Sequence, residues 1–206
     1  MAITYPLALP TATGLRTLGW KPRSVVGVSQ SPFTLSQQVY AHQGEAWAIE
    51  ATLPPQIRST AMEWVAWRLS LRGRFGTFLL GDPKGRMPRG TIAATGIAVH
   101  GAHSARTREL SLQGGEEGAT VLAGDYLQLG NGEETRLHMV LTPAAFDVSG
   151  VLTTDVWPAL RQDYADATEL VTRNCVGVFR MASNIMAWDI DDLHHYGIDF
   201  AAEEAL

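Results

Sequence analysis

Residues 54–83 read PPQIRSTAMEWVAWRLSLRGRFGTFLLGDP, and this stretch decides the fold that the sequence predicts. From Gln56 to Leu71 it contains no Gly or Pro and is rich in Ala, Leu, Met and Arg, which favours a helix over residues 56–72. The two prolines before it suit a helix start, and Gly73 suits its end. No other long segment has helical character, so we expect a mainly β protein with one principal α-helix.

The polar face of this helix carries an unexpected aromatic residue. At about 100° per residue, Glu63 and Ser70 fall in one polar stripe, and Trp67 lies in the middle of it. A large aromatic side chain in such a place is a reasonable anchor for a neighbouring subunit. We therefore take Trp67, with Glu63 and Arg74, as candidate interface residues. The alternative is that a loop or the chain's own tail covers Trp67.

Short segments rich in Val, Leu, Ile, Thr and aromatics surround the helix, separated by many of the 20 glycines and 10 prolines. This pattern is typical of β-rich proteins with many turns. Before the helix, residues 33–40 and 46–53 are expected to pair as a hairpin through a turn at residues 42–45. Further expected strands cover residues 25–28 and 75–80.

The most linker-like stretch is Lys84–Gly90, where we place a domain boundary. Beyond it, short strands recur about every ten residues, which favours a small barrel or sandwich over residues 91–169. The last part predicts a hairpin around residues 182–184 and a short strand at 197–200. These last strands are expected to complete the sheet begun by residues 25–80, so that residues 1–90 and 170–206 form one domain and 91–169 an insertion. The strands expected in the insertion and after it are 92–100, 108–113, 125–129, 136–141, 151–157, 176–181 and 185–190.

Composition narrows the possible partners. The net charge is −5 and no run of Lys and Arg is present, which disfavours nucleic-acid binding. Charged residues make up 18% of the chain, below the roughly 25% of ordinary soluble domains, so neighbours are expected to cover part of the surface.

The single Cys175 cannot form an internal disulfide, which fits synthesis in a reducing cytoplasm. No signal peptide or membrane-spanning segment is expected, because no long uninterrupted apolar run occurs.

Candidate reactive groups are few. His100 and His103 could bind a metal with Asp125 only if the fold joined them, and surface turn histidines are far commoner. The pair His194–His195 beside Asp189-Ile190-Asp191-Asp192 is more simply a solvated turn than a cation site. We therefore expect no catalytic residue, no metal and no cofactor.

Three passages resemble a known family. The first is the opening, residues 22–53, followed by the helix and strand over residues 63–83, which ends in Leu-Leu-Gly-Asp-Pro. The second combines residues 122–129, 136–141 and 147–150 with Trp157-Pro158-Ala159-Leu160-Arg161. The third runs from Phe179 to Phe200. Together they resemble siphophage and prophage tail proteins related to the distal tail protein.

The resemblance implies a tail-tube-like β-sandwich domain, built from both ends of the chain, and an inserted small β-barrel or sandwich domain. It also implies a homo-oligomeric ring, commonly a hexamer, in the virion at the tail tip. The implied partners are the tail tube protein on one side and the tail hub on the other. Because this sequence is shorter than the longer members of that family, no further large carbohydrate-binding domain is expected.

Two other functions stay open. The inserted domain could grip a host-surface polysaccharide through Trp157, Tyr126 and Tyr164, because aromatic rings stack on sugars. A cell-wall hydrolase with a carboxylate pair is the third alternative, since such pairs are assembled from distant positions in the sequence.

Overall fold

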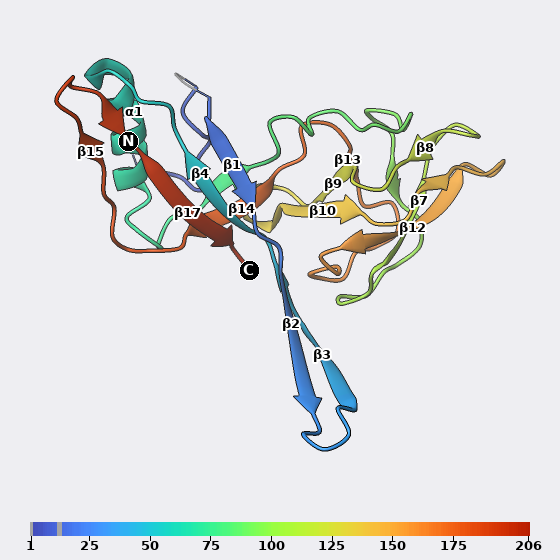
Figure 1. Cartoon of the computed structure of the whole chain (residues 1–206). Helices are drawn as coiled ribbons and strands as arrows, with labels where there is room; N and C mark the ends of the chain where they lie inside the picture. The colour runs from blue at the N-terminus through green and yellow to red at the C-terminus, as the bar shows by residue number, and fades with distance from the viewer. Residues whose placement is uncertain (1, 12–13) are drawn as a thin grey trace.

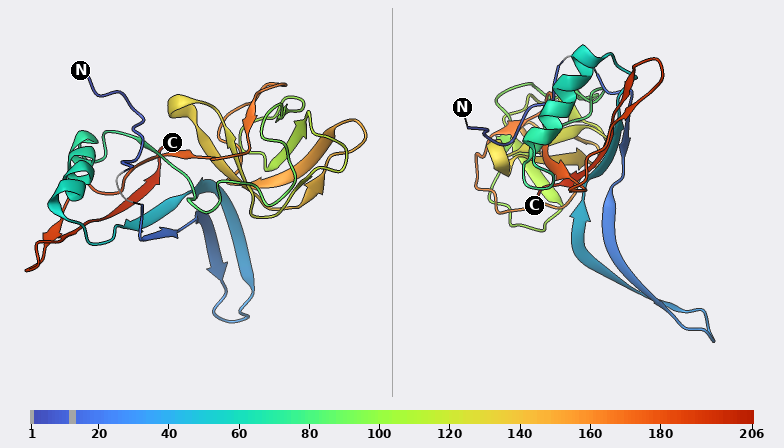
Figure 2. Two further views of the ribbon diagram at one scale, coloured as in Figure 1. Left: turned by 90° about the horizontal axis from the view of Figure 1, so that it is seen from above. Right: turned by 90° about the vertical axis from the view of Figure 1, so that its left-hand side faces the viewer.

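The computed structural model describes residues 2–11 and 14–206, and it is mainly β with one α-helix in these residues, as the sequence predicts. Two β bodies lie side by side, and a long two-stranded arm leaves the molecule from the region between them (Figure 1). The views of Figure 2 show the same arm projecting well beyond both bodies.

The first body is built on a five-stranded antiparallel sheet in the order β1-β4-β17-β14-β5. The two strands from the end of the chain lie between strands from its first half. The C-terminal strands therefore complete a sheet with strands from residues 48–80, as expected, whereas the strand material expected at residues 25–28 and 33–40 lies outside this sheet. The strands are β1 (Thr17–Trp20), β4 (Ala48–Thr52), β5 (Phe78–Leu80), β14 (Gly177–Met181) and β17 (Asp199–Glu204).

The helix α1 (Arg58–Ser70) covers one face of this sheet, which confirms the helix expected at residues 56–72 with shorter ends. Its Trp64 and Trp67 rings pack edge-to-face at 5.5 Å, and Trp67 lies 5.1 Å from Phe78. Such aromatic contacts add to the free energy gained by burying the rings.

In the part of the chain that the structure describes, α1 and the other helical segments are too short or too polar to span a membrane.

The second body is a nearly closed barrel with the strand order β13-β9-β10-β12-β7-β6. The two outer strands meet through Val99 N–H to Thr168 O at 2.8 Å and Leu170 N–H to Ile97 O at 3.1 Å. Closure leaves few free strand edges for unwanted pairing. The barrel strands are β6 (Ala98–Val99), β7 (Glu109–Gln113), β9 (Tyr126–Leu129), β10 (Arg136–Val140), β12 (Val151–Trp157) and β13 (Leu170–Val171). A separate short pair is formed by β8 (Thr120–Val121) and β11 (Ala144–Ala145). A 3₁₀ turn spans Gly132–Glu134.

The arm is formed by β2 (Arg23–Gln30) and β3 (Gln37–Ala46). The expected turn at residues 42–45 is wrong, because β3 runs straight through these residues. The chain reverses earlier, where the Ser31 hydroxyl accepts the backbone N–H of Thr34 at 3.3 Å and Leu35 N–H donates to Ser31 O at 3.0 Å. Leu35 adopts the left-handed conformation, with φ of 58°, that this tight reversal requires.

The hairpin expected around residues 182–184 is also wrong. β14 pairs with β5 and β17, and residues 185–190 turn away from the sheet. β17 occupies the place beside β14 that was expected for residues 185–190. Its Phe200 and Ala202 are buried in the core, whereas residues 187–190 are all exposed. The displaced segment instead forms β15 (Asp189–Ile190) with β16 (Tyr196–Gly197).

Candidate functional site

The arm exposes a row of apolar side chains on one of its faces. The β2–β3 register places Val28 opposite Val39 and Val26 opposite Ala41, so that these side chains share a face. Val26, Val28 and Val39 are 51%, 59% and 60% exposed. We call these four residues the valine face.

The tip of the arm is also apolar. Phe33 is 94% exposed and Leu35 is 68% exposed. Between Arg23 and His42 the arm contains no ionisable side chain except that of Tyr40. The arm therefore exposes a long, uncharged and partly apolar surface to solvent.

A two-stranded hairpin alone is marginally stable in water. Apolar exposure in one contiguous patch marks sites where proteins bind one another. Among the described residues, nothing in the same chain covers the valine face or the tip. The arm therefore has the properties of a segment that is buried against a partner in an assembly.

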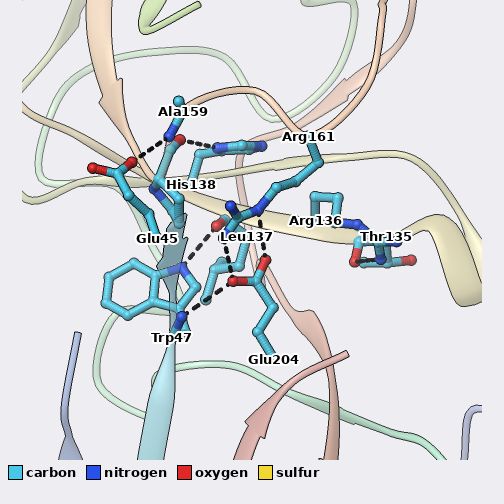
Figure 3. Close-up of polar contacts among 10 residues, drawn as sticks. Glu45, Trp47, Thr135, Arg136, Leu137, His138, Ala159, Arg161 and Glu204 are labelled. Carbon is cyan, nitrogen blue, oxygen red and sulfur yellow. Dashed lines mark hydrogen bonds and ion pairs between the residues drawn. The ribbon is translucent and has the colours of Figure 1, made fainter. Parts of the chain in front are cut away.

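The root of the arm is fixed to both bodies by buried charges (Figure 3). Glu45, at the end of β3, is 7% exposed. One of its carboxylate oxygens accepts a hydrogen bond from the Ala159 N–H at 2.9 Å, and the other pairs with the Arg108 guanidinium. Because these partners belong to the barrel, Glu45 ties the arm to it.

A second carboxylate ties the C-terminal strand to the same place. Arg161 donates to both oxygens of Glu204, at 3.3 and 2.6 Å, and Glu204 also accepts the Trp47 N–H at 3.1 Å. The Trp47 indole N–H donates to Leu137 O at 2.8 Å. Its ring packs edge-to-face on Trp157, with the ring centroids 4.4 Å apart. These contacts hold β3, β17 and the barrel as one joint, which fixes the direction of the arm.

The joint also contains the fully buried His138, which the sequence did not single out. Its Nδ1 lies 2.8 Å from Pro158 O, so Nδ1 carries the proton and donates it to that carbonyl. The pKa of His138 is lowered to about 4, chiefly by burial; the Pro158 hydrogen bond opposes this shift, and the nearby Arg161 and Arg136 contribute to it. The imidazole is therefore neutral at pH 7.

This histidine predicts an acid sensitivity. An unfolded histidine binds its proton near pH 6.5, whereas folded His138 does so only near pH 4. Between these values the unfolded state binds more protons, so the free energy of unfolding falls as the pH falls. Between pH 7 and pH 5, the wild-type protein should lose about 2 kcal/mol more than His138→Gln in urea unfolding. Parallel losses in the two proteins would contradict this assignment.

The structure corrects the expected position of Trp67. It is 8% exposed, and its indole N–H donates to Ala8 O at 2.8 Å. The N-terminal segment covers this side of the helix, which is the alternative that the sequence left open. Glu63 and Arg74 are exposed, as surface residues would be, and they lie outside the arm and its joint.

The aromatic residues expected to grip a polysaccharide do not form an open platform. Tyr126 and Tyr164 are only 8% and 3% exposed, and Trp157 is packed against Trp47. Burial raises the pKa of both tyrosines to about 12. That expectation is therefore wrong for the two tyrosines, which are core residues.

The histidines considered as metal ligands are not gathered with Asp125. Its carboxylate accepts the backbone N–H groups of Arg89, Gly90 and Leu122, which ties the linker-like stretch to the barrel. His103 instead lies within hydrogen-bond distance of His100 O and the Ser111 N–H. Within residues 2–11 and 14–206, no group of three or more His, Cys, Asp or Glu side chains is placed to hold a metal ion.

Cys175 is buried, and burial raises the pKa of its thiol to about 12. The thiol is therefore protonated at neutral pH and unsuited to act as a nucleophile.

Comparison of the chain with protein-family models and with curated proteins finds no match. The sequence predicted strands over only part of the arm, at residues 25–28 and 33–40, and missed its exposure. The usable signal was its lack of charge over nearly twenty residues, from Ser24 to Ala41.

Proposed function

We propose that this chain is a structural subunit of a phage tail that forms a ring at the distal end of the tail tube. In this role it joins the tube to the tail-tip hub, and its partners are copies of itself, the tail tube protein and the hub proteins. The observation that carries the proposal is the arm, with its exposed valine face and Phe33 tip. A projecting apolar hairpin with a rigid root suits a structural protein that binds neighbouring subunits in an assembly.

Two further features support a structural role. The buried carboxylates Glu45, Asp125 and Glu204 all bind backbone amides or arginines of the fold itself. The resemblance to distal tail proteins extends over the helix, the following strand and the C-terminal passage. It supports the tail-tip location and the sixfold ring.

Electron microscopy of intact particles that carry an antibody or gold label on this subunit tests the proposal. Label is expected at the distal end of the tail tube. Label on the capsid, or only on protein free in the lysate, would contradict it.

A further inference from the structure

A second exposed apolar surface lies far from the arm in the chain. We call residues 185–195, which include β15, the acidic hairpin. Ile185, Ile190 and Leu193 are 82%, 55% and 70% exposed. Asp189, Asp191 and Asp192 are all exposed and add negative charge to the same segment, in which Asp191 Oδ2 lies 3.3 Å from His195 Nδ1. This surface combines apolar contact area with negative charge.

The root of the arm carries the opposite charge. A cleft of about 480 Å³ lies between β3 and the barrel, and we call it the root cleft. Arg106, Arg108 and Arg161 line it with His42, and Glu45 is the one carboxylate in its lining. Arg108 and Arg161 already pair with Glu45 and Glu204, whereas Arg106 is exposed and has no carboxylate partner among the described residues.

The two surfaces are complementary in charge and alike in apolar character. The root cleft is continuous with the arm, because Ala41 belongs both to its lining and to the valine face. A partner that inserts acidic groups into the cleft therefore meets the apolar arm beside it. The acidic hairpin presents this combination, with aspartates next to exposed Ile190 and Leu193.

The acidic hairpin cannot be the intramolecular partner of the cleft in this fold. It is anchored beside α1, where Gln56 bridges to Tyr196 and the Arg68 guanidinium donates to Ala187 O at 2.9 Å. Figure 1 shows β15 at the outer end of the first body, with the five-stranded sheet between it and the root of the arm. Two different surfaces on one chain suit a head-to-tail contact, which generates a ring when the rotation closes.

We infer that the acidic hairpin of one copy binds the root cleft of the next copy, with the valine face packed beside it. This inference rests on the proposed ring function and names the two surfaces that form the ring contact. The aspartates and Arg106 would set the orientation of the contact, since charge complementarity steers association and disfavours wrong pairings.

Charge reversal tests the contact on the purified full-length protein by sedimentation velocity. Arg106→Glu and Asp192→Arg should each weaken self-association at least about tenfold at low salt, because each places like charges together. An equimolar mixture of the two variants should restore association, since the cleft of each then meets the hairpin of the other with opposite charges. Arg173→Glu and Glu117→Arg are matched controls, because both residues are exposed and outside the two surfaces.

The outcomes separate this contact from the proposed function. If each reversed variant associates as the wild type does, or if the mixture is not restored, the pairing of hairpin and cleft is wrong while ring assembly by other surfaces stands. If the wild-type protein and the mixture both remain monomeric, the contact is overturned as well. Labelled particles without signal at the tail tip would instead overturn the proposed function.

Discussion

Replacing both Val28 and Val39 by serine should lower the self-association of the purified protein by at least about twentyfold. These side chains are opposite one another on the valine face and more than half exposed in the single chain. Fully burying an exposed valine side chain stabilises a contact by roughly 1.5–3 kcal/mol, and 59% and 60% of these two side chains remain to be buried, so losing both costs about 2–3.5 kcal/mol. The melting temperature should change little, because neither side chain belongs to the core.

The matched control replaces two exposed apolar residues of the barrel, Leu141→Ser with Val148→Ser, which are 45% and 81% exposed. Sedimentation velocity over a range of concentrations measures both double variants. The control should associate as the wild type does. Equal weakening in both would show that general surface hydrophobicity, and not the arm, drives association.

Replacing Trp67 by alanine should lower the free energy of unfolding by about 3–5 kcal/mol, the usual cost of removing a buried Trp or Phe side chain. The indole packs against Trp64, Phe78 and Phe200, and its N–H binds Ala8 O. This loss is a large part of the roughly 5–15 kcal/mol that stabilises a typical domain.

Urea unfolding measures this effect, and Glu63→Ala on the same helix is its control. Because Glu63 is exposed, its replacement should change the free energy of unfolding by no more than about 0.5 kcal/mol. A cost below about 1 kcal/mol for Trp67→Ala would place this residue on the surface, where helical periodicity alone had put it.

Local patterns predicted much of the fold. The helix was predictable because residues 56–71 contain no helix breaker, and β12 has the bounds expected from its sequence, Val151–Trp157. The turn of the arm was missed because Gly44 resembles a turn residue, while the effective signal was Ser31-Pro32. Residue propensities thus predicted where many of the strands lie, but not which strands pair with one another.

Long-range contacts explain the remaining errors. Helical periodicity assumes one wet face, but a segment 59 residues upstream covers Trp67. The joint depends on Glu45 and Arg108, which are 63 residues apart, and on Arg161 and Glu204, which are 43 apart. No local pattern links such positions, so the joint could not be predicted from the sequence.

The central claim is that another copy of this chain covers the arm in the assembled particle. A photo-reactive amino acid in place of Phe33, with cross-linking in intact particles and mass spectrometry of the products, tests this claim most directly. The predicted result is a covalent dimer of this subunit that joins position 33 of one copy to a peptide of another. Particles in which position 33 cross-links only to other virion proteins, or only within its own chain, would contradict it.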